Sequence, residues 1–120
     1  MNFHFLRKHR LRKRVLFRKV YEEGRFVSNR LLSFHFLPNP DQRRRVGFAA
    51  GKKLGGAVLR NRCKRRLREC YRLNQERLPA GMDCIFVARK AMVDVDWQQL
   101  SAAFLDLLRR SRTLTGSSRR

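Results

Sequence analysis

One stretch, Lys52 to Arg72, constrains the fold of this chain more than any other. Its sequence, KKLGGAVLRNRCKRRLRECYR, holds nine Lys or Arg residues and one acid. After a Gly pair, residues with apolar, thiol or amide side chains recur at spacings of 4, 4, 3 and 4, which is the period of one helix face. The pattern predicts a helix that packs its back on a core and ends near residues 78–81. The stripe consists of Leu59, Cys63, Leu67, Cys70 and Asn74.

The opposite arc of this helix is densely cationic. Like charges three or four positions apart repel each other, by about 0.2–0.5 kcal/mol for each pair, and a single acid relieves little of this repulsion. Two interpretations follow: the face is solvated, or it meets a polyanion. The arc consists of Arg60, Asn61, Arg62, Lys64, Arg65, Arg68 and Arg72.

The net charge of the whole chain favours a polyanionic partner. The 120 residues include 30 Lys or Arg and 9 Asp or Glu, which gives a formal charge of +21. This length suits one domain with one modest core, and a hydrophobic content of 42% excludes disorder throughout the chain. Nucleic acid is therefore the first candidate partner, and an anionic membrane surface is the second.

The cysteines and the apolar runs indicate a cytoplasmic protein. Three cysteines, Cys63, Cys70 and Cys84, are too few for a disulfide framework. The sequence contains no CxxC pair, so we expect no structural zinc site. We expect them to be buried, reduced thiols. No apolar run has the length of a signal-peptide core or of a membrane span, which needs ~20 residues.

The remaining patterns predict a single α+β domain with the element order αβββαβα. Strands are expected at 25–29, 31–37, 45–51 and 82–88, and further helices at 15–23 and 97–110. Asp96 is the expected N-cap of the last helix, with a metal-binding pair of Asp94 and Asp96 as the alternative. A basic arm is expected at 1–10, the folded domain at 11–110 and a disordered basic tail at 111–120.

Two predicted strands have unusual faces. Ser33 and His35 alternate with large apolar residues, so one face of their strand offers a hydroxyl and an imidazole. One face of the strand at 45–51 carries almost no side chain, which leaves room for another backbone to approach closely. That face consists of Gly47, Ala49 and Gly51.

The chain offers no conventional catalytic constellation. A protein nuclease needs acids for a metal ion, a pair of His, or a nucleophile with a base. Glu22 and Glu23 are adjacent and point to different sides of a helix. Ser33 and His35 have no orienting acid nearby in the sequence. We therefore expect neither catalytic residues nor metal ligands in the protein itself.

The central stretch resembles the signature of the bacterial ribonuclease P protein subunit, whose Arg-Asn-Arg core corresponds to residues 60–62. The resemblance covers about residues 10–108 and includes Phe17, Tyr21, Asn29-Arg30, Arg45-Val46-Gly47 and the Ala-Arg-Lys end of the last strand. It implies a four-stranded sheet, three helices and a left-handed βαβ crossover, an exception to the usual hand. It also implies that one protein binds one catalytic RNA. The RNA, with the Mg²⁺ ions that it binds, removes the 5′ leaders from precursor tRNA.

The resemblance further implies two contact surfaces. The basic helix contacts the catalytic RNA, and a cleft between the first helix and the sheet holds the single-stranded leader. The spacing of Phe17 and Tyr21 by itself favours the core, whereas the resemblance implies base stacking. The implied RNA-binding residues are Lys52, Lys53, Arg60, Asn61, Arg62, Lys64, Arg65 and Arg68. The implied cleft residues are Phe17, Tyr21, Ser33, His35, Arg89 and Lys90.

The sequence departs from the family pattern at three places. Gly56 replaces a frequent Asn, Ala49-Ala50-Gly51 replaces a more hydroxylic stretch, and His35 stands where another aromatic residue is common. The main alternative is that the chain is a ribosomal or nucleoid-type protein that binds nucleic acid in a structural role. A membrane-active protein is the third possibility and a stand-alone nuclease the fourth.

Overall fold

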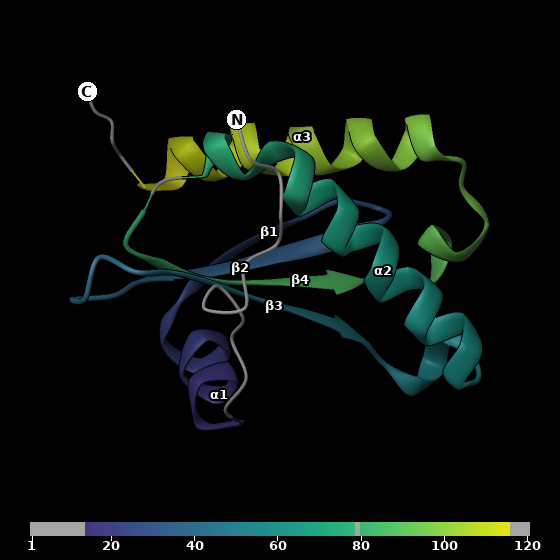
Figure 1. Cartoon of the computed structure of the whole chain (residues 1–120), viewed down its shortest axis with the longest axis horizontal. Helices are drawn as coiled ribbons and strands as arrows, with labels where there is room; N and C mark the ends of the chain where they lie inside the picture. The colour runs from purple at the N-terminus through teal and green to yellow at the C-terminus, as the bar shows by residue number, and fades with distance from the viewer. Residues whose placement is uncertain (1–13, 79, 116–120) are drawn as a thin grey trace.

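The structure, a computed structural model, describes residues 14–78 and 80–115, and it confirms the predicted α+β fold and element order (Figure 1). Three helices and four strands form one small domain, with short 3-10 helices (η) between them. In chain order the elements are α1 (Arg14–Glu23), β1 (Arg25–Ser28), β2 (Leu32–Pro38), β3 (Arg44–Ala50), η2 (Lys52–Leu54), α2 (Ala57–Asn74), η3 (Gln75–Arg77), β4 (Met82–Ala88), η4 (Lys90–Asp94) and α3 (Trp97–Thr115).

The four strands form one mixed sheet in the order β1-β2-β4-β3. β1 and β2, and β2 and β4, are antiparallel, whereas β3 and β4 are parallel and are connected through α2. In the central strand, Ile85 lies opposite His35 of β2 on one side and Gly47 of β3 on the other. The left hand of the β3-α2-β4 crossover stays a prediction from the resemblance.

The larger core lies between the sheet and the layer formed by α2 and α3, above the sheet in Figure 1. Phe86 of β4 stacks between Phe34 of β2 and Phe104 of α3, with ring centroids 4.6 Å from each. The predicted stripe of α2 faces this core, where Cys63, Leu67 and Cys70 are buried. The apolar face of α3 is buried as well, through Leu100, Phe104, Leu107 and Leu108.

A smaller cluster lies under the sheet, where α1 packs against β2 and β4 (Figure 1). Val20 and Ile85 are fully buried there, and the half-buried Phe17 ring lies on Gly47. A Cβ atom added to Gly47 would stand 2.4 Å from Phe17 Cζ. The room predicted at Gly47 for another backbone is therefore filled by a side chain of the protein itself, while Ala49 stays half-exposed.

Polar side chains fix the ends of the strands. Asn29 joins the β1-β2 turn to α3: its Oδ1 accepts the amides of Leu31 and Leu32, and its Nδ2 donates to the Ala103 carbonyl. At the opposite end of the sheet, buried Asp83 of β4 forms a bidentate ion pair with Arg45 of β3.

The last helix differs from the prediction in its length. It runs to Thr115, so residues 111–115 of the predicted disordered tail are helical. Its start was predicted correctly: Asp96 Oδ1 accepts the Gln99 amide at 2.8 Å and Gln99 Oε1 accepts the Asp96 amide, a reciprocal N-cap. The predicted arm at 1–10 and residues 116–120 of the tail lie outside the described residues. No helix in the described ranges is long and apolar enough to cross a membrane.

Candidate nucleic-acid interface

Aromatic side chains line one row of the sheet on the α1 side. The row crosses the strands from Phe26 through His35 and Ile85 to Gly47, since these residues are direct neighbours in the strand pairings. The Tyr21 ring meets the His35 ring edge-on, with centroids 4.9 Å apart. The tilted Phe17 ring lies 6.3 Å from Tyr21 and covers Gly47. The structure thus brings Phe17, Tyr21 and His35 together.

The polar groups of this aromatic row are suited to uncharged contacts. Partial burial lowers the pKa of His35, so its imidazole is neutral at pH 7. His35 Nε2 and Ser33 Oγ lie 3.2 Å apart and share a hydrogen bond. Burial also raises the pKa of the Tyr21 phenol, which keeps it protonated. Neutral rings of this kind stack on nucleobases or donate and accept single hydrogen bonds.

The next row of the sheet forms a floor of small side chains. Ser28, Ser33, Val87 and Ala49 lie side by side on the four strands, and all four are half-exposed. Figure 1 places α1 below one part of the sheet and the start of α2 beyond the tip of β3. The floor therefore lies between the aromatic residues Phe17 and Tyr21 of α1 and the basic residues that follow β3.

The predicted cations Arg89 and Lys90 follow β4, at the end of the sheet where the floor row lies. Both are exposed. The Arg89 guanidinium donates to the Asn29 carbonyl at 3.0 Å, and its amide donates to the Leu31 carbonyl. Arg89 is therefore held in place beside the floor, with the remaining N–H groups of its guanidinium available to an anion.

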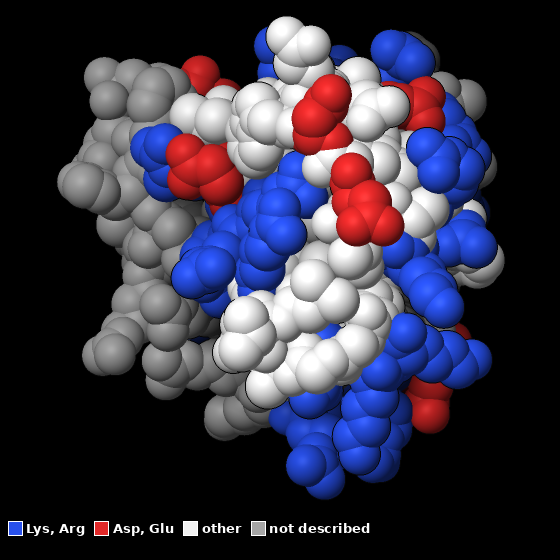
Figure 2. Space-filling view, turned by 90° about the vertical axis from the view of Figure 1, so that its right-hand side faces the viewer, with Lys and Arg blue, Asp and Glu red and all other residues white. Residues whose placement is uncertain are grey.

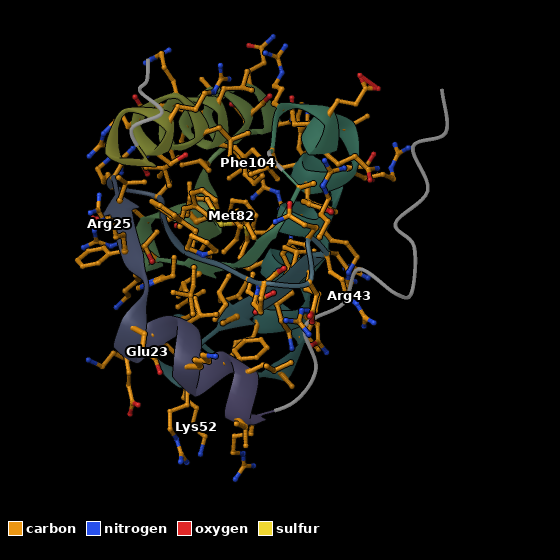
Figure 3. All side chains as sticks on the ribbon, turned by 90° about the vertical axis from the view of Figure 1, so that its left-hand side faces the viewer. Glu23, Arg25, Arg43, Lys52, Met82 and Phe104 are labelled. Carbon is orange, nitrogen blue, oxygen red and sulfur yellow. The ribbon has the colours of Figure 1, made fainter. Side chains whose placement is uncertain are left out.

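The basic residues of η2 and α2 gather at the end of the molecule that faces the viewer in Figure 2. There, Lys and Arg side chains flank a strip of uncharged residues. In Figure 3, Lys52 lies on the same side of the sheet as α1. Lys52 of this basic surface thus lies on the side of the sheet that carries the floor. The exposed members of the basic surface are Lys52, Lys53, Asn61, Arg62 and Arg65.

The other predicted cations of α2 are partly buried. The Nε of Arg60 is buried and has no hydrogen-bond partner among the described residues. Arg68 lies over the Phe48 ring, 5.6 Å from its centroid. Lys64 is half-buried.

Two further basic residues of α2 have structural contacts. Arg66, which the sequence analysis did not single out, donates to the Met92 and Val95 carbonyls and ties η4 to α2. Arg72 pairs with Glu69, and its guanidinium lowers the pKa of that carboxyl through a hydrogen bond. Glu69, the single acid of the stretch from Lys52 to Arg72, is therefore paired.

The three cysteines are buried and free, as predicted. Burial raises the pKa of all three thiols, that of Cys70 to about 12, which keeps them protonated and unreactive. In the described part of the chain, no three His, Cys, Asp or Glu side chains gather closely enough to hold a metal ion.

Three residues of this surface were not predicted from the sequence. Phe26 stacks on His35 from the edge strand, with ring centroids 5.2 Å apart. Ser28 completes the floor beside Ser33, and Arg110 of α3 donates to the Ser28 carbonyl at 3.0 Å. Phe26 and Ser28 alternate with Val27, and this period-two pattern was the available signal. The approach of Arg110 to β1 has no signal in the sequence.

Comparisons with known proteins agree on one family. A family model described as Ribonuclease P matches residues 5–112. The chain is 43% identical to a ribonuclease P protein component of Alkaliphilus oremlandii, over 90% of this chain and 95% of the relative. The structure of the Staphylococcus aureus RNase P protein superimposes with a TM-score of 0.80 at 30% identity, over 87% of this chain and 95% of that one. For the Thermotoga maritima RNase P protein the TM-score is 0.76 at 32% identity, over 84% and 96%.

Proposed function

The chain belongs to the ribonuclease P protein family, and we propose that it is the protein subunit of a cytoplasmic ribonuclease P holoenzyme that gives tRNA its mature 5′ end. In this proposal α2 binds the catalytic RNA, and the aromatic row and the floor on the α1 side of the sheet bind the 5′ leader of precursor tRNA. One protein acts with one RNA. Cleavage and the Mg²⁺ ions that it needs belong to the RNA.

One observation carries the assignment of the two surfaces: the half-exposed floor lies between aromatic rings and a basic helix. Small side chains on a sheet allow a sugar–phosphate backbone to come close. The rings of Tyr21 and His35 offer stacking surfaces for unpaired bases. The guanidinium of Arg62 and its neighbours on α2 suits phosphate. A single strand on the floor can thus enter directly from an RNA bound on α2.

At least three of the nine acids are already held in other contacts, which supports the placement of catalysis in the RNA. Asp83 is buried in an ion pair, Asp96 caps α3, and Glu69 pairs with Arg72. A metal-dependent protein nuclease would need such carboxylates free and close together. The net charge of +21 suits a different role, which is to offset repulsion between phosphates.

Cleavage assays on the separate components test the proposal. The purified protein is expected to cut no precursor tRNA. Together with its RNA it is expected to lower the Mg²⁺ concentration that cleavage requires, because its cations take over part of the charge screening. The measurement is the rate of 5′-leader release across a Mg²⁺ titration, with RNA alone as reference. Cleavage at the mature 5′ end by protein alone, abolished by Glu69→Gln, would contradict the proposal.

Substitutions on α2 test the RNA-binding surface. Replacing both Arg62 and Arg65 by Ala is expected to weaken binding to the catalytic RNA. It is also expected to reduce the slope of log K against log salt concentration by about 0.7–0.9 for each phosphate that the protein no longer neutralises. The helix holds these guanidinium groups in place for phosphate. The measurement is a binding titration at several salt concentrations.

The charge-matched control is the pair Arg77→Ala and Arg109→Ala, two exposed arginines outside the proposed surface. These substitutions remove the same net charge and are expected to change the affinity far less. Equal losses for both pairs would mean that net charge alone determines binding. A ribosomal or nucleoid-type protein, the alternative function, would bind ribosomal RNA or DNA as tightly as the ribonuclease P RNA.

A further inference from the structure

Phe26 is a large apolar side chain that packing does not explain. It lies on the edge strand β1, and 59% of its surface is exposed, whereas its neighbour Val27 is buried in the core. Single exposed apolar residues are common. Phe26, however, is joined through His35 to Tyr21, which is itself 44% exposed. These three rings form a continuous aromatic surface on the α1 side of the sheet.

The strand pairing fixes the position of Phe26. It lies directly opposite His35 in the antiparallel β1-β2 ladder. The amide of Asn29 bonds to Leu32 at the end of this ladder, so alternation makes Phe26 and His35 a non-hydrogen-bonded pair, whose side chains stand closer together. The two ring planes are inclined by only 21° at a centroid distance of 5.2 Å. His35 thus supports one side of the Phe26 ring, and much of the remainder is open to solvent.

Cations lie close to this edge of the sheet. Arg110 donates to the Ser28 carbonyl, and Arg89 donates to the Asn29 carbonyl, each at 3.0 Å. Both residues are exposed. Arg110 also pairs with Asp106 at 3.3 Å, which offsets part of its charge, whereas the Arg89 guanidinium keeps further N–H donors. The end of β1 therefore combines an open aromatic ring with fixed positive charge, which is the combination that single-stranded nucleic acid requires.

We propose that Phe26 is a further base-stacking residue, which extends the leader site across the sheet to the β1 edge. This inference rests on the proposed function. The catalytic RNA on α2 lies on the β3 side of the sheet, because η2 and α2 follow β3. The leader therefore passes Phe17 and Tyr21 first and reaches Phe26 last. Three strand spacings of about 4.8 Å separate Gly47 from Phe26, so the site is roughly 14 Å wide.

The test uses the reconstituted holoenzyme and precursor tRNAs whose leaders grow one nucleotide at a time. Phe26→Ala is expected to leave the affinity for short leaders unchanged and to weaken binding of long leaders by about five- to thirtyfold, the lower part of the range for one stacked base. Tyr21→Ala is expected to take effect at a shorter leader length. Phe26→Leu keeps apolar area without an aromatic ring and is expected to resemble Phe26→Ala.

Trp97→Ala is the matched control, because Trp97 is an exposed aromatic residue in the α3 layer, on the other side of the sheet. It is expected to bind all leaders like the wild type. Wild-type affinity of Phe26→Ala for every leader would overturn the proposal, as would equal losses for short leaders, long leaders and mature tRNA. Failure of the proposed function has a different signature: the wild-type holoenzyme itself would not prefer precursor over mature tRNA.

Discussion

Replacement of Asp83 by Ala is expected to lower the free energy of unfolding by about 3–5 kcal/mol, since it leaves a largely buried charge without its partner. The Asp83 carboxylate accepts from Arg45 Nε at 2.7 Å, from Arg45 Nη2 at 3.0 Å and from Asn39 Nδ2 at 2.9 Å. The Asp83 side chain is 4% exposed and that of Arg45 is 18% exposed. Stabilities of about 5–15 kcal/mol are usual, so this loss is a large fraction of the total.

The measurement is the midpoint of urea unfolding at constant m-value. Glu69→Ala is the control, because it removes a carboxylate that also pairs with an arginine, but at the surface. Exposed pairs contribute about 0–1 kcal/mol. If both variants unfolded at the same urea concentration, the network of Asp83, Arg45 and Asn39 would not stabilise the sheet as we describe.

The second large effect is expected at Tyr21, on binding rather than on stability. Tyr21→Ala should weaken binding of precursor tRNA to the holoenzyme and leave binding of mature tRNA nearly unchanged, because only the precursor carries a leader. One base stacked on an aromatic ring contributes about 1–3 kcal/mol, a change of about 5- to 150-fold in affinity. Tyr21 is exposed, so its removal should cost little folding free energy.

Phe17→Ala is expected to behave differently from Tyr21→Ala, although the two residues share a helix face. The Phe17 ring covers Gly47 within the small cluster of Val20 and Ile85. Its loss should lower the melting temperature as well as the preference for precursor. Both affinities and the melting temperature are measured on the same proteins at one salt concentration. If the Tyr21→Ala protein were strongly destabilised and kept its preference for precursor over mature tRNA, Tyr21 would be a core residue and not part of the leader site.

Local patterns were sufficient to predict most of the fold. The strand β2 and the helix α2 have clear periodicity, and their side chains face the core as the spacing indicated. The strand β4 was predicted as an apolar run buried on both faces, and it is. The end of α3 was placed too early. Arg112 and the polar residues after it resemble a tail in composition, yet buried Ser111 bonds to the Leu108 carbonyl within the helix.

The spacing of residue types along the sequence does not predict which distant segments pair. The sequence offers a side-chain-poor face at Gly47, and nothing in the spacing says that Phe17 fills it. Asp83 lies in an apolar run, and its pairing with Arg45 depends on strand order. Phe26 becomes part of the aromatic surface only because β1 pairs with β2 in one register.

The late position of β4 in the chain has a consequence for synthesis. β4 occupies the middle of the sheet, between β2 and β3, but it is the last strand to leave the ribosome. Until Met82–Ala88 is made, β3 has no neighbour in the sheet, α1 lacks Ile85 to pack on, and the back of α2 lacks Phe86 and Cys84. Pairings between distant segments form slowly, so the two surfaces that we propose for RNA binding take shape together, only after β4 has been made. An incomplete chain thus displays positive charge without the geometry that would make it selective.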